Sequence, residues 1–212
     1  MRRREVLAGT GGVVALSITG CLGVVGMDEH EASPAGVEPS VREATGYEQT
    51  NVEELVVRET VDAVSEEVTV RNYLTEHEKS VDLGPVGTVE GAAFVLLTSP
   101  QISLAGRDFN PIAEMSSEEL IDLLEGDFDG IDDAEHVSDE ETTVLGQETT
   151  DSLFEAEAQF SGVPIDVNIH ITESVQTTND HLVTIGVYPE QLESEEADNV
   201  ASLVDGVVES PD

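Results

Sequence analysis

Two neighbouring stretches of this chain alternate strictly between apolar and polar residues. In residues 154–160 every even-numbered residue is Phe or Ala, and the residues between them are Glu or Gln. In residues 165–171 every odd-numbered residue is Ile or Val, and the residues between them are Asp, Asn and His. A period of two is typical of strands with one buried face, and the intervening Ser-Gly pair predicts a hairpin. The chain therefore contains an antiparallel sheet with one face exposed to water.

Other segments predict further strands and helices. Apolar alternation or continuous apolar runs indicate strands near residues 57–61, 68–74, 92–97, 102–104 and 182–188. Ser116 and Glu119 form a capping box that predicts a helix ending at Gly126. Helices are also expected near residues 39–45 and 200–208. Runs of strands interrupted by single helices predict the α+β class, with an antiparallel β-sheet and helices packed on it.

Acidic residues dominate the composition, with 46 Asp and Glu against 8 Lys and Arg and a formal net charge of −38. Hydrophobic residues still make up 39% of the chain, which indicates a folded core. A compact body with this charge repels itself in dilute buffer, whereas molar salt shortens the Debye length to about 3 Å. We therefore expect a halophilic protein. The charge argues against nucleic acid as a partner, because few cationic side chains are available to neutralise phosphates.

The first 21 residues have the features of an export signal. Arg3 and Arg4 precede an apolar core at residues 6–18, which is shorter than the ~20 residues that span a bilayer. The paired arginines resemble those of a twin-arginine signal, which implies export after folding. The signal ends in Ile18-Thr19-Gly20-Cys21, which is similar to a lipobox.

Cys21 is the only cysteine in the chain. Its position at the expected cleavage site predicts that its thiol carries a lipid, which would anchor the protein to the cell membrane on the side facing away from the cytoplasm. The alternative is an unmodified free or buried cysteine. If Cys21 is lipidated, no thiol remains for a disulfide, a redox centre or a Cys-based metal site.

These features divide the chain into three parts. Residues 1–20 form a twin-arginine lipoprotein signal peptide, and residues 21–38, rich in Gly, Pro and acids, form a flexible acidic tether. Residues 39–212 form a single α+β domain.

The polar face of the predicted hairpin is the first candidate ligand site. His170 lies there near Asp166, Asn168 and Glu157, and a histidine among carboxylates can serve as a general base or a metal ligand. An ordinary solvated sheet face explains the same residues, and the sequence favours that explanation. The five histidines form no His-Glu-x-x-His motif or His-x-His pair, so neither a metal nor another cofactor is expected.

The segment 106–111 is the second candidate. It concentrates Gly, Asn and Pro around one basic residue, and Arg107, Asp108 and Asn110 could form a recognition loop. A specialised turn, in which Arg107 neutralises nearby carboxylates, is the favoured alternative.

Several short motifs resemble those of an uncharacterised family of haloarchaeal twin-arginine lipoproteins. They are Thr45-Gly46-Tyr47, Thr98-Ser99-Pro100, the 106–111 segment, Leu145-Gly146 and Tyr188-Pro189-Glu190. The family brings no assigned activity and no catalytic residue. The order of predicted elements also resembles PsbP-like lipoproteins, which implies an α/β/α sandwich.

The sequence favours a non-enzymatic binding or accessory protein of the cell envelope. The reason is that it has no recognisable nucleophile–base set. The alternative is a surface hydrolase that uses carboxylates and His170. The expected partners are membrane lipid through Cys21 and a second envelope protein or small ligand, with the protein itself monomeric.

Overall fold

The computed structural model describes residues 28–61, 66–84, 87–104, 107–108, 112, 115–121, 131–160 and 163–210. The export signal with Arg3 and Arg4, the lipidation residue Cys21 and the loop residue Asn110 lie outside these ranges. Within them, strands account for most of the chain.

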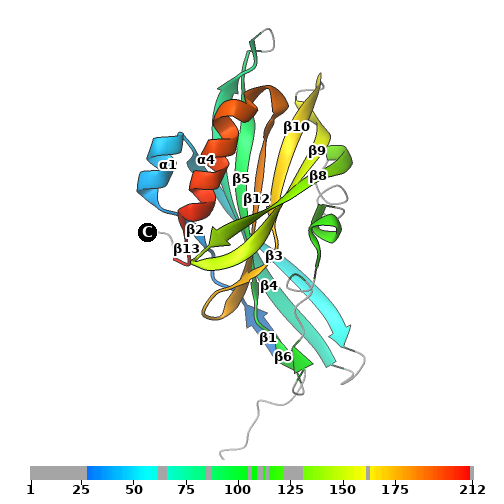
Figure 1. Ribbon diagram of the computed structural model, residues 1–212. Coiled ribbons are helices and arrows are strands. Elements are labelled where there is room, and N and C mark those ends of the chain that lie inside the picture. The colour runs from blue at the N-terminus through cyan, green and yellow to red at the C-terminus, as the bar shows by residue number, and fades with distance from the viewer. Residues whose placement is uncertain are drawn as a thin grey trace, which may run out of the picture.

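One nine-stranded sheet forms the body of the molecule (Figure 1). Its strands run in the order β1-β4-β5-β12-β10-β9-β8, with β3 also paired to β4 and β11 to β12. β1 is parallel to β4, and the remaining pairs are antiparallel. The strands are β1 (Asp28–Glu31), β3 (Glu48–Val61), β4 (Glu66–Asp82), β5 (Thr88–Pro100), β8 (Ile131–Val144), β9 (Gln147–Phe160), β10 (Val163–Thr172), β11 (Val175–Gln176) and β12 (Asp180–Pro189).

Smaller elements complete the fold. Two short sheets pair β2 (Gly36–Val37) with β13 (Val207–Val208) and β6 (Ser103–Leu104) with β7 (Arg107–Asp108). The helices are α1 (Pro39–Thr45), the 3-10 helix η2 (Glu190–Leu192) and α4 (Glu193–Asp205), and residues 117–121 are also helical. Figure 1 places α1 and α4 together on one side of the sheet.

The expected fold class is wrong. The chain is mostly β, built on one large mixed sheet, and is not an antiparallel sheet with helices packed on it in a PsbP-like α/β/α sandwich. Much of the difference lies in β8, which no pattern in the sequence predicts. This strand is rich in Asp, Glu and Thr and is mostly solvent-exposed. Because it is an edge strand with little buried surface, it carries no apolar alternation that would reveal it.

The expected tether is also too long. Residues 28–38 belong to the folded body, because β1 pairs with β4 and β2 pairs with β13. Ala32, Ala35 and Val37 in this segment are buried. The boundary expected at residue 38 is therefore corrected to a position before Asp28.

The predicted hairpin is confirmed as β9 and β10, with Phe154 opposite Ile169 and Ala156 opposite Val167. These four side chains belong to one apolar cluster, which the helical residues 117–121 cover through Leu120 and Ile121. The capping box at the start of that helix is present, since Ser116 and Glu119 exchange hydrogen bonds between side chain and backbone at 2.9 and 3.3 Å.

A second apolar cluster lies where α1 and α4 cover the sheet. Val200, Leu203 and Val204 of α4 pack there against Phe94 and Leu96 of β5. The helix approaches the sheet closely at Gly186 of β12, where an added Cβ would lie 2.7 Å from a Val200 methyl carbon. The helix expected near residues 200–208 is therefore confirmed, although it begins at Glu193 and residues 207–208 form a strand.

A buried polar network fixes α4 to the sheet. The carboxylate of Glu196, only 2% exposed, accepts hydrogen bonds from Lys79 Nζ of β4 at 2.6 Å and from Tyr47 Oη at 2.9 Å. Lys79 is the only lysine in the chain, and its ammonium also lies 5.8 Å from the centre of the Tyr47 ring. Tyr47 follows Gly46, which ends α1 in a left-handed conformation with φ of 81°.

Candidate functional site

The predicted ligand face divides into two places. Asp166, Asn168 and His170 of β10 and Glu157 of β9 share one side of the sheet, and Asp166 lies directly opposite Glu157. Asp166 and Glu157 are solvent-exposed, whereas Asn168 is buried and His170 is half-buried. The four side chains therefore do not form one common site.

His170 is held on both sides of its ring. Its Nδ1 lies 2.7 Å from Asp151 Oδ2, and its Nε2 lies 3.0 Å from the hydroxyl of Tyr188. The Tyr188 ring stacks on the imidazole at 5.7 Å between centres, and its hydroxyl also accepts a hydrogen bond from the Asn168 amide. The resulting chain runs from Asn168 through Tyr188 and His170 to Asp151, with each donor matched to an acceptor.

This arrangement leaves neither ring nitrogen of His170 free to take a proton from a substrate. The neighbouring phenol is also a poor nucleophile, because Tyr188 is 1% exposed and burial raises the pKa of its hydroxyl. A small cavity of about 180 Å³ adjoins the cluster, lined by Ser138, Glu140, Asp151, Leu153, His170, Tyr188, Glu193 and Ala197. The geometry is that of a structural support between the sheet and the start of α4.

The exposed half of the predicted face lines an open acidic hollow of about 370 Å³. Its carboxylates come from β8, β9, β10 and η2, and they are Asp133, Glu135, Glu155, Glu157, Asp166 and Glu190. No group of acids, histidines or cysteines with metal-binding geometry occurs in the described ranges. The hollow is part of the acidic surface that the composition predicts.

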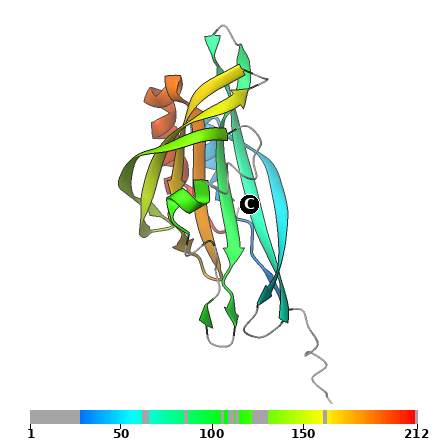
Figure 2. The ribbon, with the colours of Figure 1, turned by 90° about the vertical axis from the view of Figure 1, so that its right-hand side faces the viewer.

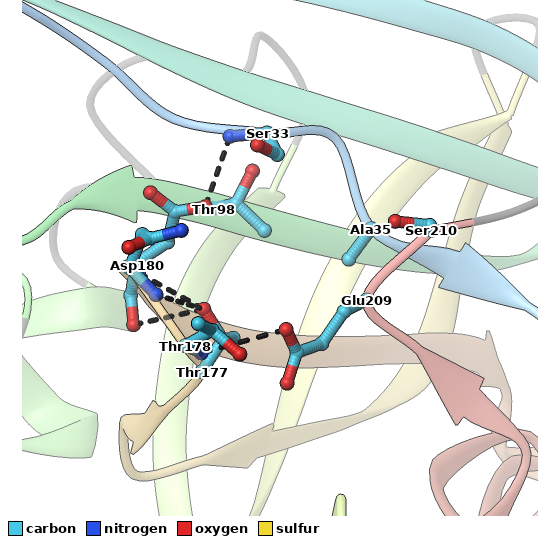
Figure 3. A pocket seen from close by; sticks show the side chains of 9 residues that line it. Ser33, Ala35, Thr98, Thr177, Thr178, Asp180, Glu209 and Ser210 are labelled. Atoms are coloured by element: carbon cyan, nitrogen blue, oxygen red, sulfur yellow. Dashed lines mark hydrogen bonds between the residues drawn. The ribbon is translucent and has the colours of Figure 1, made fainter.

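A third cavity, of about 270 Å³, lies where distant parts of the chain meet (Figure 3). It is lined by Ser33 and Ala35 from the N-terminal segment, Thr98 of β5, the 177–180 turn, and Glu209 and Ser210 near the C-terminus. The wall is mostly hydroxyl and carboxylate groups, and none of the described residues that line it is basic. We define this space as the 180 cavity, after the aspartate that anchors it.

Asp180 is 5% exposed and joins the segments that form the 180 cavity. Its Oδ2 accepts a hydrogen bond from the backbone N–H of Ser33 at 2.9 Å, across 147 residues of sequence. Its own N–H donates to Thr177 Oγ1 at 2.9 Å, which closes the turn before β12. At the other wall the N–H of Thr178 lies 3.4 Å from Glu209 Oε2.

The electrostatics of the 180 cavity are unfavourable for its own acids. Burial raises the pKa of Asp180, and the nearby charge of Glu209 raises it further, while the Ser33 N–H and His181 act in the opposite direction. The surroundings of the Asp180 carboxylate supply too little positive charge to offset its burial. The cavity can therefore accept a hydrogen-bond donor or a cation, and it is poorly suited to an anion.

No motif in the sequence predicts the 180 cavity. The run Thr177-Thr178-Asn179-Asp180 reads only as a polar turn between strands, and Ser33 and Glu209 belong to no motif. The second predicted candidate lies only partly within the described chain, since Asn110 is outside it. Arg107 and Asp108 lie in β7, a two-residue strand paired with β6, which forms a hairpin at the end of the molecule in Figure 2.

Three further observations concern features outside these cavities. Among the helices of the described residues, none is long and apolar enough to cross a membrane. A family designated DUF6517, a domain of unknown function, matches residues 34–208. A comparison with curated proteins found no match.

Proposed function

Because the chain belongs to this family of unknown function, we propose from its own features that it is a non-enzymatic ligand-binding domain. We further propose that it is anchored by a lipid on Cys21 to the outside of the membrane of a halophilic cell. The observation that carries the binding role is the 180 cavity, where a buried carboxylate and several hydroxyl groups converge from four remote segments. A binding role needs such convergence of polar groups in a concave site.

The hydrolase alternative receives less support. It requires a histidine with a free ring nitrogen next to a reachable nucleophile, whereas both nitrogens of His170 are engaged by Asp151 and Tyr188. The acids near this histidine, Asp151 and Glu140, line a cavity of only about 180 Å³. A polymeric or peptide substrate would not fit there.

The anchoring role rests on the export signal and the lipobox. Their likeness to haloarchaeal twin-arginine lipoproteins supports export in the folded state from a salt-filled cytoplasm. Between Cys21 and the start of β1 at Asp28 there are seven residue steps, which reach at most about 25 Å. A lipid on Cys21 would therefore hold the 180 cavity close to the membrane surface, where ligands of the envelope are concentrated.

The anchor is tested by cell fractionation. We expect wild-type protein in the membrane fraction and the Cys21→Ser variant in the soluble extracytoplasmic fraction. Replacing Arg3 and Arg4 by Lys is the control for the route, and it should retain the protein inside the cell. Membrane retention of the Cys21→Ser variant would refute the anchor.

The binding role is tested on the full chain carrying Cys21→Ser in 2 M KCl. A screen of small amines, polyols and carboxylic acids is followed through the backbone amide resonances of residues 177–180. Saturable shifts at these amides with any member of the screen support a binding site. No saturable shift with any of them would contradict a ligand-binding role for the 180 cavity.

A further inference from the structure

We propose that the ligand of the 180 cavity is a small organic cation carrying a primary ammonium group, held between Asp180 and Glu209. This inference rests on the proposed binding role of the cavity and names the chemical class that it selects. Figure 3 shows Ser33, Asp180 and Glu209 reaching the cavity from three different segments of the chain.

The negative charge of the cavity wall determines the sign of the charge that the ligand carries. Asp180 and Glu209 are both acids, and the lining contains no described Lys, Arg or His. His181, which follows Asp180 but does not line the cavity, offsets only part of the effect of burial on Asp180. Burying a carboxylate without a compensating positive charge costs free energy. The backbone N–H of Ser33 supplies a single neutral donor to Asp180 Oδ2. A cation placed between the two carboxylates would relieve both the burial of Asp180 and its repulsion from Glu209.

The acceptors in the wall determine the kind of cation. Besides the two carboxylates, the lining includes the hydroxyl groups of Thr98 and Thr178. The Thr177 hydroxyl already accepts the backbone N–H of Asp180 and donates to its carbonyl oxygen. A primary ammonium group has three N–H donors and matches several such acceptors at once. A coordinated metal ion is less well matched, because the described residues form no group of three or more Asp, Glu, His or Cys side chains that could hold one.

The size of the cavity limits the ligand. A volume of about 270 Å³ corresponds to roughly nine water molecules at ~30 Å³ each. It lies just below the range of ~300–1,000 Å³ that is common for larger ligands. The ligand therefore has only a few non-hydrogen atoms, as in an amino alcohol.

The test uses ethanolamine, ethylene glycol and glycolate as matched probes on the full chain carrying Cys21→Ser in 2 M KCl. The glycol replaces the ammonium group of ethanolamine by a hydroxyl, and glycolate carries a negative charge. We expect ethanolamine alone to give saturable shifts of the amides of residues 177–180 and Glu209. Asp180 is buried, and a buried charge is screened by salt less than an exposed one.

Two variants identify the groups that recognise the probe. Asp180→Asn keeps an oxygen that can accept the Ser33 N–H but removes the charge, and we expect at least a tenfold weaker affinity for ethanolamine, roughly the value of a charged hydrogen bond. Glu209→Gln should weaken binding in the same direction from the other wall. Asp166→Asn, which changes an acid of the separate acidic hollow, is the matched control and should bind as wild type does.

The outcomes separate this inference from the proposed function. Equal binding of ethylene glycol and ethanolamine, or unchanged affinity in both Asp180→Asn and Glu209→Gln, would refute the cation and leave the binding role intact. Equal weakening in Asp166→Asn would show that ethanolamine senses only the general negative charge, and this too would refute the site. Absence of saturable shifts with every amine, polyol and acid would overturn both proposals.

Discussion

Replacing Lys79 by Met removes the positive charge of the buried network that joins α4 to β4. Glu196 is 2% exposed and Lys79 is 16% exposed, at a distance of 2.6 Å. Breaking a buried ion pair by removing one partner costs about 3–5 kcal/mol, since the remaining charge is left without compensation. The hydroxyl of Tyr47 still donates to the carboxylate at 2.9 Å, so we expect a loss near the lower limit, about 3 kcal/mol.

This loss is a large part of the 5–15 kcal/mol that stabilises a typical domain. It is measured by urea unfolding at a fixed 2 M KCl, followed by circular dichroism. The triple variant Lys79→Met, Glu196→Leu, Tyr47→Phe removes all three polar groups together. Replacing a buried ionic cluster by apolar side chains is often neutral or stabilising, so the triple variant should recover to within about 1 kcal/mol of wild type.

Arg71 provides the matched control, because it pairs with Glu29 and Glu54 near the surface of the sheet. Exposed ion pairs contribute little to stability, so Arg71→Met should lose much less than Lys79→Met. The reasoning is refuted if the Lys79 and Arg71 variants lose equal free energy, or if the triple variant is no more stable than Lys79→Met alone.

Three further predictions concern packing, pH and salt. Gly186→Ala places a methyl group against Val200 and should cost about 1–3 kcal/mol of unfolding free energy. Adding Val200→Ala should give a combined loss smaller than the sum of the two single losses. Strict additivity of the losses would contradict the contact. Burial lowers the pKa of His77 from 6.5 to about 4, so the unfolded chain binds this proton first, and stability should fall as the pH decreases from about 6.5 to about 4. His77→Gln should reduce that decrease in a pH series of urea titrations, and an unchanged slope would exclude His77 as its source. Transfer from 2 M KCl to dilute buffer should abolish cooperative unfolding, because the net charge of −38 is then no longer screened; undiminished stability would contradict a halophilic fold.

Local patterns in the sequence were sufficient to predict an element wherever one of its faces is buried and the other is exposed, or where side chains cap its end. The alternation in residues 154–160 and 165–171 correctly predicted β9 and β10, and Ser116 with Glu119 correctly predicted a helix start. The same method failed for β8 and for residues 28–38. β8 is a mostly exposed edge strand, and β1 depends on pairing with β4, about 40 residues away, so neither leaves a periodic apolar signal.

The sequence by itself determined the acidity of the protein and its solitary cysteine, and it predicted an export signal and a lipid on Cys21. It also placed His170 on the polar side of a strand. Only the tertiary structure decided that Asp151 and Tyr188 engage both nitrogens of that histidine. It likewise decided that Ser33, Asp180 and Glu209 meet around one cavity. Such a site depends on contacts between remote segments, such as Ser33 and Asp180, which lie 147 residues apart, and no local pattern in a single chain carries that information.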